Sequence, residues 1–323
     1  MNKRERFDAA VRGAEVDYPP CNVWLHFVTD ALPGEEAARR HARYFRTYDW
    51  DLCKVMHDYR YPLPAGMETL KSAADMLRFE ALPPTIANYA EQLKLIRALR
   101  ADLGPDVPIV DTFFDPFQQV MRKAGYSAAP LVYANPREAL KMLDAVTESC
   151  CGYLRELKKA GCDAVLYSIN GGIAPPGERG IDDETFKTFL KPFDLRVLAA
   201  MEGMTRILHV HGTHVDMKRV LDYPCEVISV SDRLKGNPSL AELRKLTDKC
   251  LMGGINEQKI QERSLPEIRA EMWDALKQAG KRKFMITPGC TSAPQTPEHI
   301  LRCVRETSRA FADAKDKAAG RLA

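Results

Sequence analysis

The chain has 323 residues, with 47 basic and 44 acidic side chains and a formal net charge of +3. This near balance argues against nucleic-acid binding, which needs a clustered basic excess. Hydrophobic residues make up 45% of the chain and charged residues 28%, the composition of a globular rather than a disordered protein. No apolar run approaches the length of about 18 residues that a membrane span requires.

The cysteine pattern indicates a reducing compartment. The nine cysteines are scattered without a CxxC pair, and only Cys150 and Cys151 are adjacent. A secreted disulfide framework would have an even number at regular spacings. The charged start, Met1–Arg6, leads into no apolar stretch of the kind that a secretory signal has. We therefore expect a cytoplasmic protein whose cysteines are mostly small buried apolar groups.

Short apolar runs alternate along the chain with longer segments of helical spacing. Eight runs are predicted to be strands: 21–27, 51–57, 108–114, 163–169, 205–212, 225–231, 250–256 and 283–290. The helices predicted between them are 85–103, 136–160, 183–203, 240–249, 265–279 and 297–314. Eight strand-then-helix units in one chain predict an α/β fold, the (β/α)8 TIM barrel.

The alternative fold is a doubly wound open sheet. It is disfavoured because no GxGxxG follows the first predicted strand. No break in composition divides the chain, so residues 1–323 are predicted to form a single domain. Within it, the proline-rich segment 62–84 is a candidate cover for the barrel mouth, and 315–323 is predicted to be a frayed tail.

The predicted strands end on polar or metal-binding residues. In this kind of barrel the active site is built at the C-terminal ends of the strands, whereas an ordinary hydrophilic turn would be rich in Lys and Glu. The residues found at these ends are His26, His57, Asp111, Asp115, Asn170, His209, His211, Asp232, Asn256 and Cys290. We therefore predict that the functional site is assembled from members of this set.

The pair His209 and His211 is the sharpest local feature. Two residues apart on a strand, both side chains project from the same face, which is the barrel interior if Leu208 and Val210 face the helices. Cys290 follows the last strand and would complete a set of two nitrogens and one sulfur, as in a three-ligand zinc site with an open position. The alternatives are two hydrogen-bonded core histidines and an inert buried cysteine.

Asp232 is the candidate fourth, exchangeable metal ligand. It follows the strand after the one that carries the two histidines. Its alternative roles are an ion pair with Arg233 and the N-cap of a helix.

Catalytic and substrate-binding roles are predicted for other strand ends. Asp115 lies beside aromatic residues, which can raise the proton affinity of a carboxylate for acid–base work; the alternative is a turn aspartate before Pro116. His57 is a candidate for proton transfer. The predicted substrate-binding residues are His26, Asp111, Asn170 and Asn256.

Taken together, these motifs resemble the uroporphyrinogen decarboxylase superfamily. The matching segments are 51–56, 163–192, 207–212, 253–256, 287–290 and 296–300. The resemblance covers most of the chain. It implies a (β/α)8 barrel, and a homodimer as in many members of the family.

The superfamily has two branches with different chemistry. True uroporphyrinogen decarboxylases use no metal and bind a polyanionic tetrapyrrole through an arginine-rich segment after the first strand. This chain has no arginine between Arg12 and Arg39, so the many carboxylates of such a substrate would lack the cations that replace water. The absence of arginine after the first predicted strand therefore favours the other branch, the corrinoid-dependent methyltransferases.

These methyltransferases carry a zinc motif of His-x-Cys followed by a distant Cys. The matching positions here are His209, His211 and Cys290, the last of them 79 residues beyond His211, so a histidine replaces the middle cysteine. Asp232 matches a position at which this branch can place a carboxylate on the metal.

The resemblance implies a zinc-dependent methyltransferase that moves a methyl group between a corrinoid and a small, thiol-type acceptor. The corrinoid (methylcobalamin) would be carried by a partner protein, because this chain has no DxHxxG motif. Two alternatives remain open. One is a decarboxylase-like lyase acting on a carboxylated substrate, and the other is a non-catalytic relative that binds a ligand.

Overall fold

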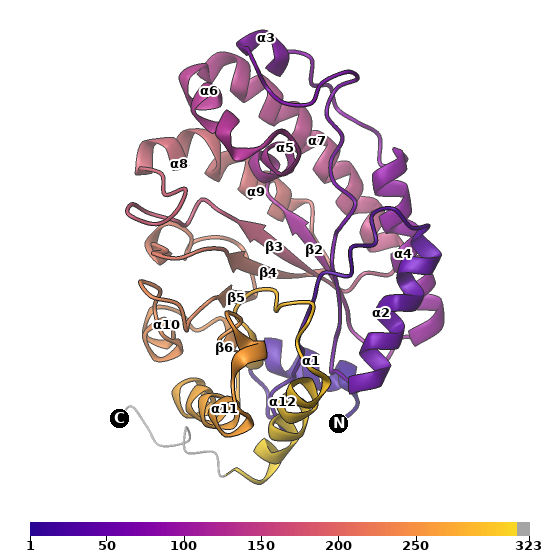
Figure 1. Ribbon diagram of the computed structural model, residues 1–323, viewed down its shortest axis with the longest axis vertical. Helices are drawn as coiled ribbons and strands as arrows, with labels where there is room; N and C mark the ends of the chain where they lie inside the picture. The colour runs from indigo at the N-terminus through magenta and orange to yellow at the C-terminus, as the bar shows by residue number, and fades with distance from the viewer. Residues whose placement is uncertain (315–323) are drawn as a thin grey trace.

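Seven parallel strands form the centre of the computed structural model, which describes residues 1–314. Each strand pairs with the next one along the chain, in the order β1 to β7 (Figure 1). Their bounds are Cys53–Val55, Ile109–Phe114, Ala164–Ile169, Thr205–Val210, Val227–Val230, Cys250–Ile255 and Phe284–Pro288. The α/β class and seven of the eight predicted strands are thus confirmed, and the predicted tail 315–323 lies outside the described residues.

The first predicted strand, 21–27, is not formed. This segment makes a single parallel bridge between Cys21 and Ile286. The carbonyl of Pro20 accepts from the Ile286 N–H at 2.9 Å, and the Cys21 carbonyl accepts from the Asp51 N–H at 3.0 Å. The chain therefore lies between β7 and β1 at this point without a ladder, so the described residues form an open, seven-stranded barrel and not the predicted (β/α)8 barrel. Side chains take up backbone groups that a ladder would use, because the Cys21 N–H donates to Asp51 Oδ2 at 2.9 Å and the Val23 carbonyl accepts from the Tyr44 hydroxyl at 3.0 Å.

The helices cover the outside of the sheet (Figure 1). Those predicted from the sequence are α4 (Ala87–Leu103), α7 (Pro136–Lys159), α8 (Asp183–Phe189), α9 (Lys191–Ala199), α10 (Leu240–Leu246), α11 (Leu265–Ala279) and α12 (Glu298–Ala310). The helix predicted at 183–203 is broken into α8 and α9 at Leu190. Pro192 accounts for the break, because its ring clashes with the carbonyl four residues earlier in a continuous helix.

Five further helices were not predicted. They are α1 (Lys3–Arg12), α2 (Gly34–Tyr48), α3 (Ala73–Met76), α5 (Pro116–Ala124) and α6 (Ala129–Ala134). The segment 62–84 carries α3, which packs against α7 at the upper edge of Figure 1. Ser149 of α7 accepts from the Leu82 N–H at 2.8 Å. Among the described residues, no helix is both long and apolar enough to cross a bilayer.

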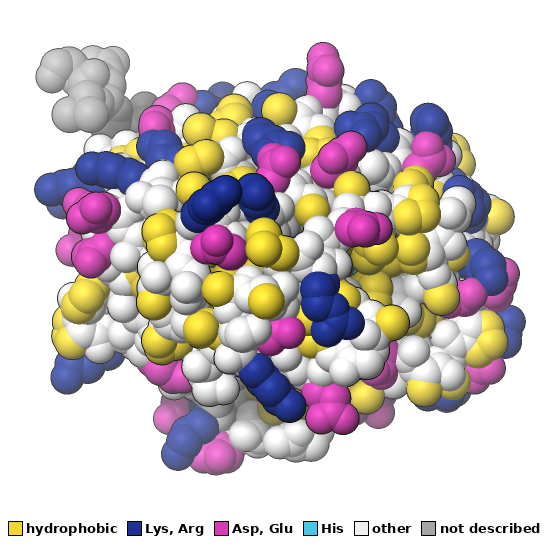
Figure 2. Space-filling model, turned by 90° about the horizontal axis from the view of Figure 1, so that it is seen from above, with side chains coloured by type: hydrophobic (Ala, Val, Ile, Leu, Met, Phe, Trp, Pro, Cys, Tyr) yellow, Lys and Arg dark blue, Asp and Glu magenta, His cyan; other side chains and the backbone are white. Residues whose placement is uncertain are grey.

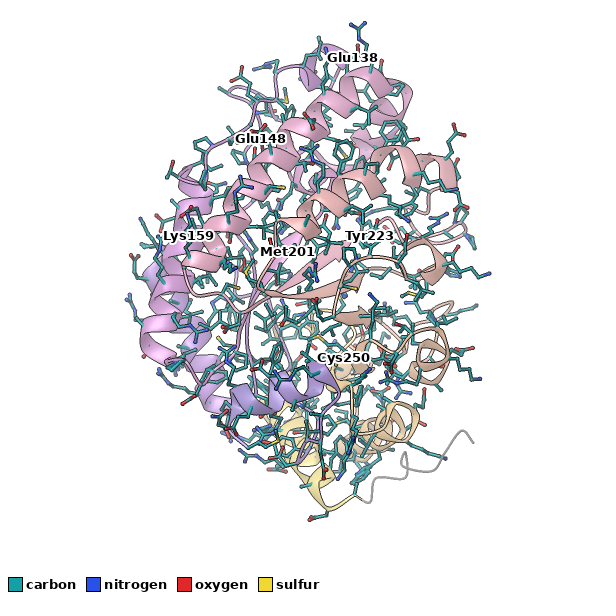
Figure 3. All side chains as sticks on the ribbon, turned by 180° about the vertical axis from the view of Figure 1, so that it is seen from behind. Glu138, Glu148, Lys159, Met201, Tyr223 and Cys250 are labelled. Atoms are coloured by element: carbon teal, nitrogen blue, oxygen red, sulfur yellow. The ribbon has the colours of Figure 1, made fainter. Side chains whose placement is uncertain are left out.

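The alternation of side chains along the strands divides the apolar core in two. One set, which includes Val55, Phe113 and Val210, packs between the sheet and the helices. The other set fills the interior of the barrel and includes Met56, Val110, Leu166, Ile207, Met252 and Met285. Phe7 of α1 belongs to this inner set, and Cys250, the first residue of β6, lies beside α1 in Figure 3. Helix α1 thus closes the end of the barrel where the strands begin.

A buried carboxylate ties the two ends of the chain together at this closed end. Asp51 has no exposed surface. Its Oδ1 accepts from Arg6 Nη1 at 2.9 Å, and its Oδ2 accepts from Arg305 Nη1 at 2.7 Å. This network links α1, the start of β1 and α12. On the face of the molecule seen in Figure 2, by contrast, acidic and basic side chains are intermixed.

Candidate metal centre and adjoining cavity

Three metal-binding side chains meet at the open end of the barrel. His209 is on β4, His211 follows that strand, and Cys290 lies two residues beyond β7. One ligand atom from each lies within 4.8 Å of the others, and Cys290 Sγ is 3.6 Å from His211 Nδ1. Leu208 and Val210 belong to the outer core, so the histidines point inward as the alternation predicts.

Neighbouring strands fix the positions of these side chains. Ser229 of β5 lies opposite His209 in the sheet register, and its Oγ is 3.2 Å from His209 Nδ1. That contact occupies one ring nitrogen and leaves the other for a metal. The turn that delivers Cys290 depends on Gly289, because a Cβ there would lie 2.4 Å from the Cα of Ser231.

The cluster is a buried, low-charge environment. Burial lowers the pKa of His209 well below its usual range, and the nearby His211 and Lys54 lower it further. Burial also lowers the pKa of His211, so both imidazoles are neutral and can donate to a metal. Burial raises the pKa of the Cys290 thiol to about 12. A divalent cation between these atoms would reverse that effect and hold the thiolate.

A cavity of about 220 Å³ opens beside the cluster. Its wall contains the three cluster residues and a mixture of apolar, polar and basic side chains, including Trp24, His26, Lys54, Thr112, Phe114, Arg122, Tyr126, Leu166, Asn170 and Arg179. In the part of the chain that the structure describes, neither a carboxylate nor any residue of 62–84 lines this cavity.

The model of the uroporphyrinogen decarboxylase (URO-D) family matches residues 53–311. The chain belongs to this family.

The relatives of this family member include curated methyltransferases. It is 24% identical over 248 residues to the methylcobamide:CoM methyltransferase MtaA of Methanosarcina barkeri, a match that covers 75% of this chain and 68% of the relative. It is 26% identical over 148 residues to the uroporphyrinogen decarboxylase of Syntrophotalea carbinolica, which covers 43% of this chain and 41% of that protein. The predicted closer similarity to the methyltransferase branch is thus confirmed.

Solved structures support the fold. A methyltransferase from Methanosarcina mazei superposes with a TM-score of 0.78 at 19% identity, over 96% of this chain and 99% of that one. A B12-independent methionine synthase from Shewanella sp. W3-18-1 superposes with a TM-score of 0.57 at 12% identity, over 86% of this chain and 87% of that one.

Asp232 does not join the metal cluster of this family member. Its Oδ1 accepts from the Gly254 N–H at 2.7 Å, and its Oδ2 lies 3.2 Å from Arg233 Nε. The ion pair with Arg233, the alternative from the sequence, is therefore what the structure contains. The reason is strand phase: Ser229 and Ser231 point toward the site, so Asp232, one residue further, points away.

Glu257 is a buried carboxylate near the cluster that the sequence analysis missed. Its Oε1 accepts from Ser231 Oγ at 2.7 Å, and its Oε2 is buried without a hydrogen-bond partner among the described residues. Its negative charge helps to raise the pKa of Cys290. The only signal in the sequence was its place one residue after the predicted strand 250–256.

Two predicted substrate-binding residues, His26 and Asn170, line the cavity. His26 Nδ1 is 2.8 Å from Asp58 Oδ1, and Asn170 Nδ2 donates to the Tyr126 hydroxyl at 2.8 Å.

His57 and Asp111 lie on the other side of the sheet from the cavity. Lys54 on β1 faces the interior, so the phase of the strand turns His57 outward, where it packs against the rings of Phe113 and Tyr153. Asp111 accepts from the Tyr153 hydroxyl at 2.9 Å and lies 3.7 Å from His57 Nδ1. The structure therefore does not bring His57, predicted for proton transfer, or Asp111, predicted for substrate binding, to the site.

Asp115 and Asn256 stabilise local backbone instead of lining the cavity. Asp115 is the N-cap of α5 and accepts from the Gln118 N–H at 2.7 Å. Burial raises its pKa to about 6, although hydrogen bonds from Gln118 and Asn170 oppose this. Asn256 Oδ1 accepts from the Gln258 N–H at 2.9 Å. Asp115 is thus the turn aspartate that the sequence analysis offered as the alternative.

Three basic residues of the cavity wall were not predicted. Lys54 is buried on β1, where its Nζ donates to Thr112 Oγ1 and burial lowers its pKa to about 8. The sequence did contain a signal for Lys54, because it alternates with the apolar residues Leu52 and Met56 and therefore shares their inward direction. Arg122 and Arg179 reach the cavity from α5 and from the loop after β3, and nothing in their local sequence marks them.

Proposed function

We propose that this family member is a zinc-dependent methyltransferase that moves a methyl group between a corrinoid on a separate protein and a small thiol acceptor. The observation that carries the proposal is the convergence of His209, His211 and Cys290 on one point beside a cavity. The similarity to curated methylcobamide:CoM methyltransferases, about two thirds of whose length the chain spans, supports the reaction class and the corrinoid.

The donor set fits zinc. Two neutral imidazoles and one cysteine are typical zinc ligands, and three protein ligands with an open fourth position are typical of catalytic rather than structural zinc sites. When bound, the zinc would supply Lewis acidity that lowers the pKa of an acceptor thiol. Replacing the family's middle cysteine by His211 removes one negative charge from the ligand set, which strengthens this effect.

The residues around the cluster position the acceptor and exclude water. Ser229 orients the ring of His209. Trp24, Phe114 and Leu166 supply an apolar wall, and Lys54 places a cation at its base, 5.4 Å from the Trp24 ring. A cavity of about 220 Å³ is far too small for a corrinoid macrocycle, so the macrocycle has to approach from the mouth while the acceptor occupies the cavity.

A lyase acting on a small carboxylated substrate is the second candidate. The observation that favours it is the presence of Lys54, Arg122 and Arg179 in a cavity wall without a carboxylate among the described residues. The three cations could hold a substrate carboxylate.

The test is methyl transfer from free methylcobalamin to 2-mercaptoethanesulfonate and 2-mercaptoethanol by zinc-loaded protein. We expect demethylation of the corrinoid by the wild type and by Cys303→Ala, a control that removes a buried cysteine of α12. We expect none by Cys290→Ala. A zinc-loaded wild type that transfers no methyl group to either thiol would contradict the proposal, and release of CO₂ from small carboxylic acids would then support the lyase.

A further inference from the structure

A second cavity of about 230 Å³ adjoins the one at the metal centre. Three residues, Tyr126, Asn170 and Arg179, line both cavities. They therefore form the partition between the two. The far wall of the second cavity is apolar and comprises Phe117, Ala129, Pro130, Tyr133, Ile181 and Leu190.

The partition consists of three side chains that contact one another. The Arg179 guanidinium stacks on the Tyr126 ring, 3.9 Å from its centroid, and Asn170 Nδ2 donates to the Tyr126 hydroxyl. Arg179 is about half exposed, and its ion-pair partner is the solvent-exposed Glu178 at 3.5 Å. Asn170 Oδ1 is buried without a hydrogen-bond partner among the described residues. These groups are available to a ligand that reaches from one cavity into the other.

The first cavity carries a second arginine beside the partition. Arg122 lies over the Phe114 ring, 3.6 Å from its centroid, and donates to the His57 carbonyl at 3.5 Å. In the described part of the chain it has no carboxylate within salt-bridge distance. Among the described residues, Arg179 pairs only with the solvent-exposed Glu178. The two guanidinium groups therefore favour an oxyanion, because their fork geometry matches two oxygens of a carboxylate or sulfonate.

The second cavity suits an aromatic group. The rings of Phe117 and Tyr133 stack with centroids 5.4 Å apart and planes 5° apart, and Leu190 and Pro130 continue the apolar surface. Pockets for small molecules usually measure about 300–1,000 Å³. Each cavity alone is smaller than this range, whereas the two joined would fall within it.

We propose that the preferred acceptor is a branched organic anion larger than the two-carbon thiols, which carry no group that could fill the second cavity. Its carboxylate or sulfonate lies at Arg122 and Arg179, its aryl group occupies the second cavity, and its thiol arm reaches the metal centre. The thiol arm rests on the proposed function. The anion and the aryl group rest on the cavities alone.

Two thiols that differ only in a benzyl group test this proposal. Titration calorimetry on the zinc-loaded protein compares 2-benzyl-3-mercaptopropanoate with 3-mercaptopropanoate. We expect the benzyl compound to bind at least about tenfold more tightly, because an aryl group leaves water. Ala129→Trp fills the second cavity and should reduce this ratio to about one. Ala129→Phe serves the same purpose with a smaller ring if the tryptophan variant does not fold.

A second pair of probes separates this proposal from the proposed function. Metal-free protein is titrated with 3-phenylpropanoate and with propanoate, neither of which carries a thiol. Tighter binding of 3-phenylpropanoate, weakened by Arg179→Gln and by Ala129→Trp, supports the two-cavity proposal even if zinc or methyl transfer fails. Equal affinities within each pair, or a benzyl preference that survives filling of the second cavity, would overturn it.

Discussion

Ser229→Ala should weaken zinc binding without unfolding the protein. The Ser229 hydroxyl lies 3.2 Å from His209 Nδ1, and both residues are buried. The substitution leaves that ring nitrogen without a partner and frees the ring to rotate away from the cluster. Outer hydrogen bonds of this kind are worth about 10–100-fold in metal affinity, or about 1.4–2.7 kcal/mol. The loss of one neutral hydrogen bond costs the metal-free fold only about 0.5–1.5 kcal/mol.

The assay is competition for zinc with a chromophoric chelator. Ser308→Ala is the matched control, because Ser308 is a fully buried serine of α12 that donates to the Arg305 carbonyl at 2.8 Å. The control should lose comparable folding stability and keep the zinc affinity of the wild type. If Ser229→Ala binds zinc as tightly as the wild type, or if both variants weaken binding equally, Ser229 does not orient a metal ligand.

Three further outcomes follow from buried carboxylates. Asp51→Ala leaves Arg6 and Arg305 without the carboxylate that pairs with them. The variant should lower the free energy of unfolding by about 3–5 kcal/mol in urea denaturation, and a loss below about 1 kcal/mol would be inconsistent with a buried network. Burial raises the pKa of Asp194 well above its usual value, so the folded state favours the protonated carboxyl. This contribution to stability is fully present below the unfolded-state pKa of about 3.9 and is lost as pH rises toward the folded-state pKa. The stability of the wild type relative to Asp194→Asn should therefore fall as pH rises above about 4, and a constant difference would refute the shift. Glu257→Gln should lower zinc affinity by about tenfold and Asp232→Asn should not; the reverse order would place Asp232 at the metal.

The sequence predicts the convergence of His209, His211 and Cys290 because the signal for it is local. The spacing of His209 and His211 determines their common direction on any strand, and the strand pattern alone places both at the open end of the barrel. Cys290 depends on the turn at Gly289, which the sequence displays directly. The same logic of strand phase, applied to each strand end in turn, would have excluded His57 and Asp232 from the site, since both are one residue out of phase with inward-facing neighbours.

The missing parts are those set by tertiary structure. Arg179 is in a loop that folds back on the barrel because Arg219 donates to the carbonyls of Gly171 and Ile173 at 3.2 and 3.1 Å. Arg122 reaches the cavity only because of the direction of α5. The first predicted strand, 21–27, rests on apolar character alone, whereas Asp51 and Tyr44 bind backbone groups of this segment that a ladder would use. Neither loop anchoring nor helix direction has a local signature in a single sequence.

The metal content of the purified protein tests the central claim most directly. Zinc is measured by mass spectrometry in the wild type, His211→Ala, Cys290→Ala and the Cys303→Ala control, each after dialysis against buffer with limiting zinc. We predict about one zinc per chain in the wild type and in Cys303→Ala, and a loss of zinc in both cluster variants. A wild type that takes up no zinc, or cluster variants that retain it, would contradict the assignment of a metal centre to these residues.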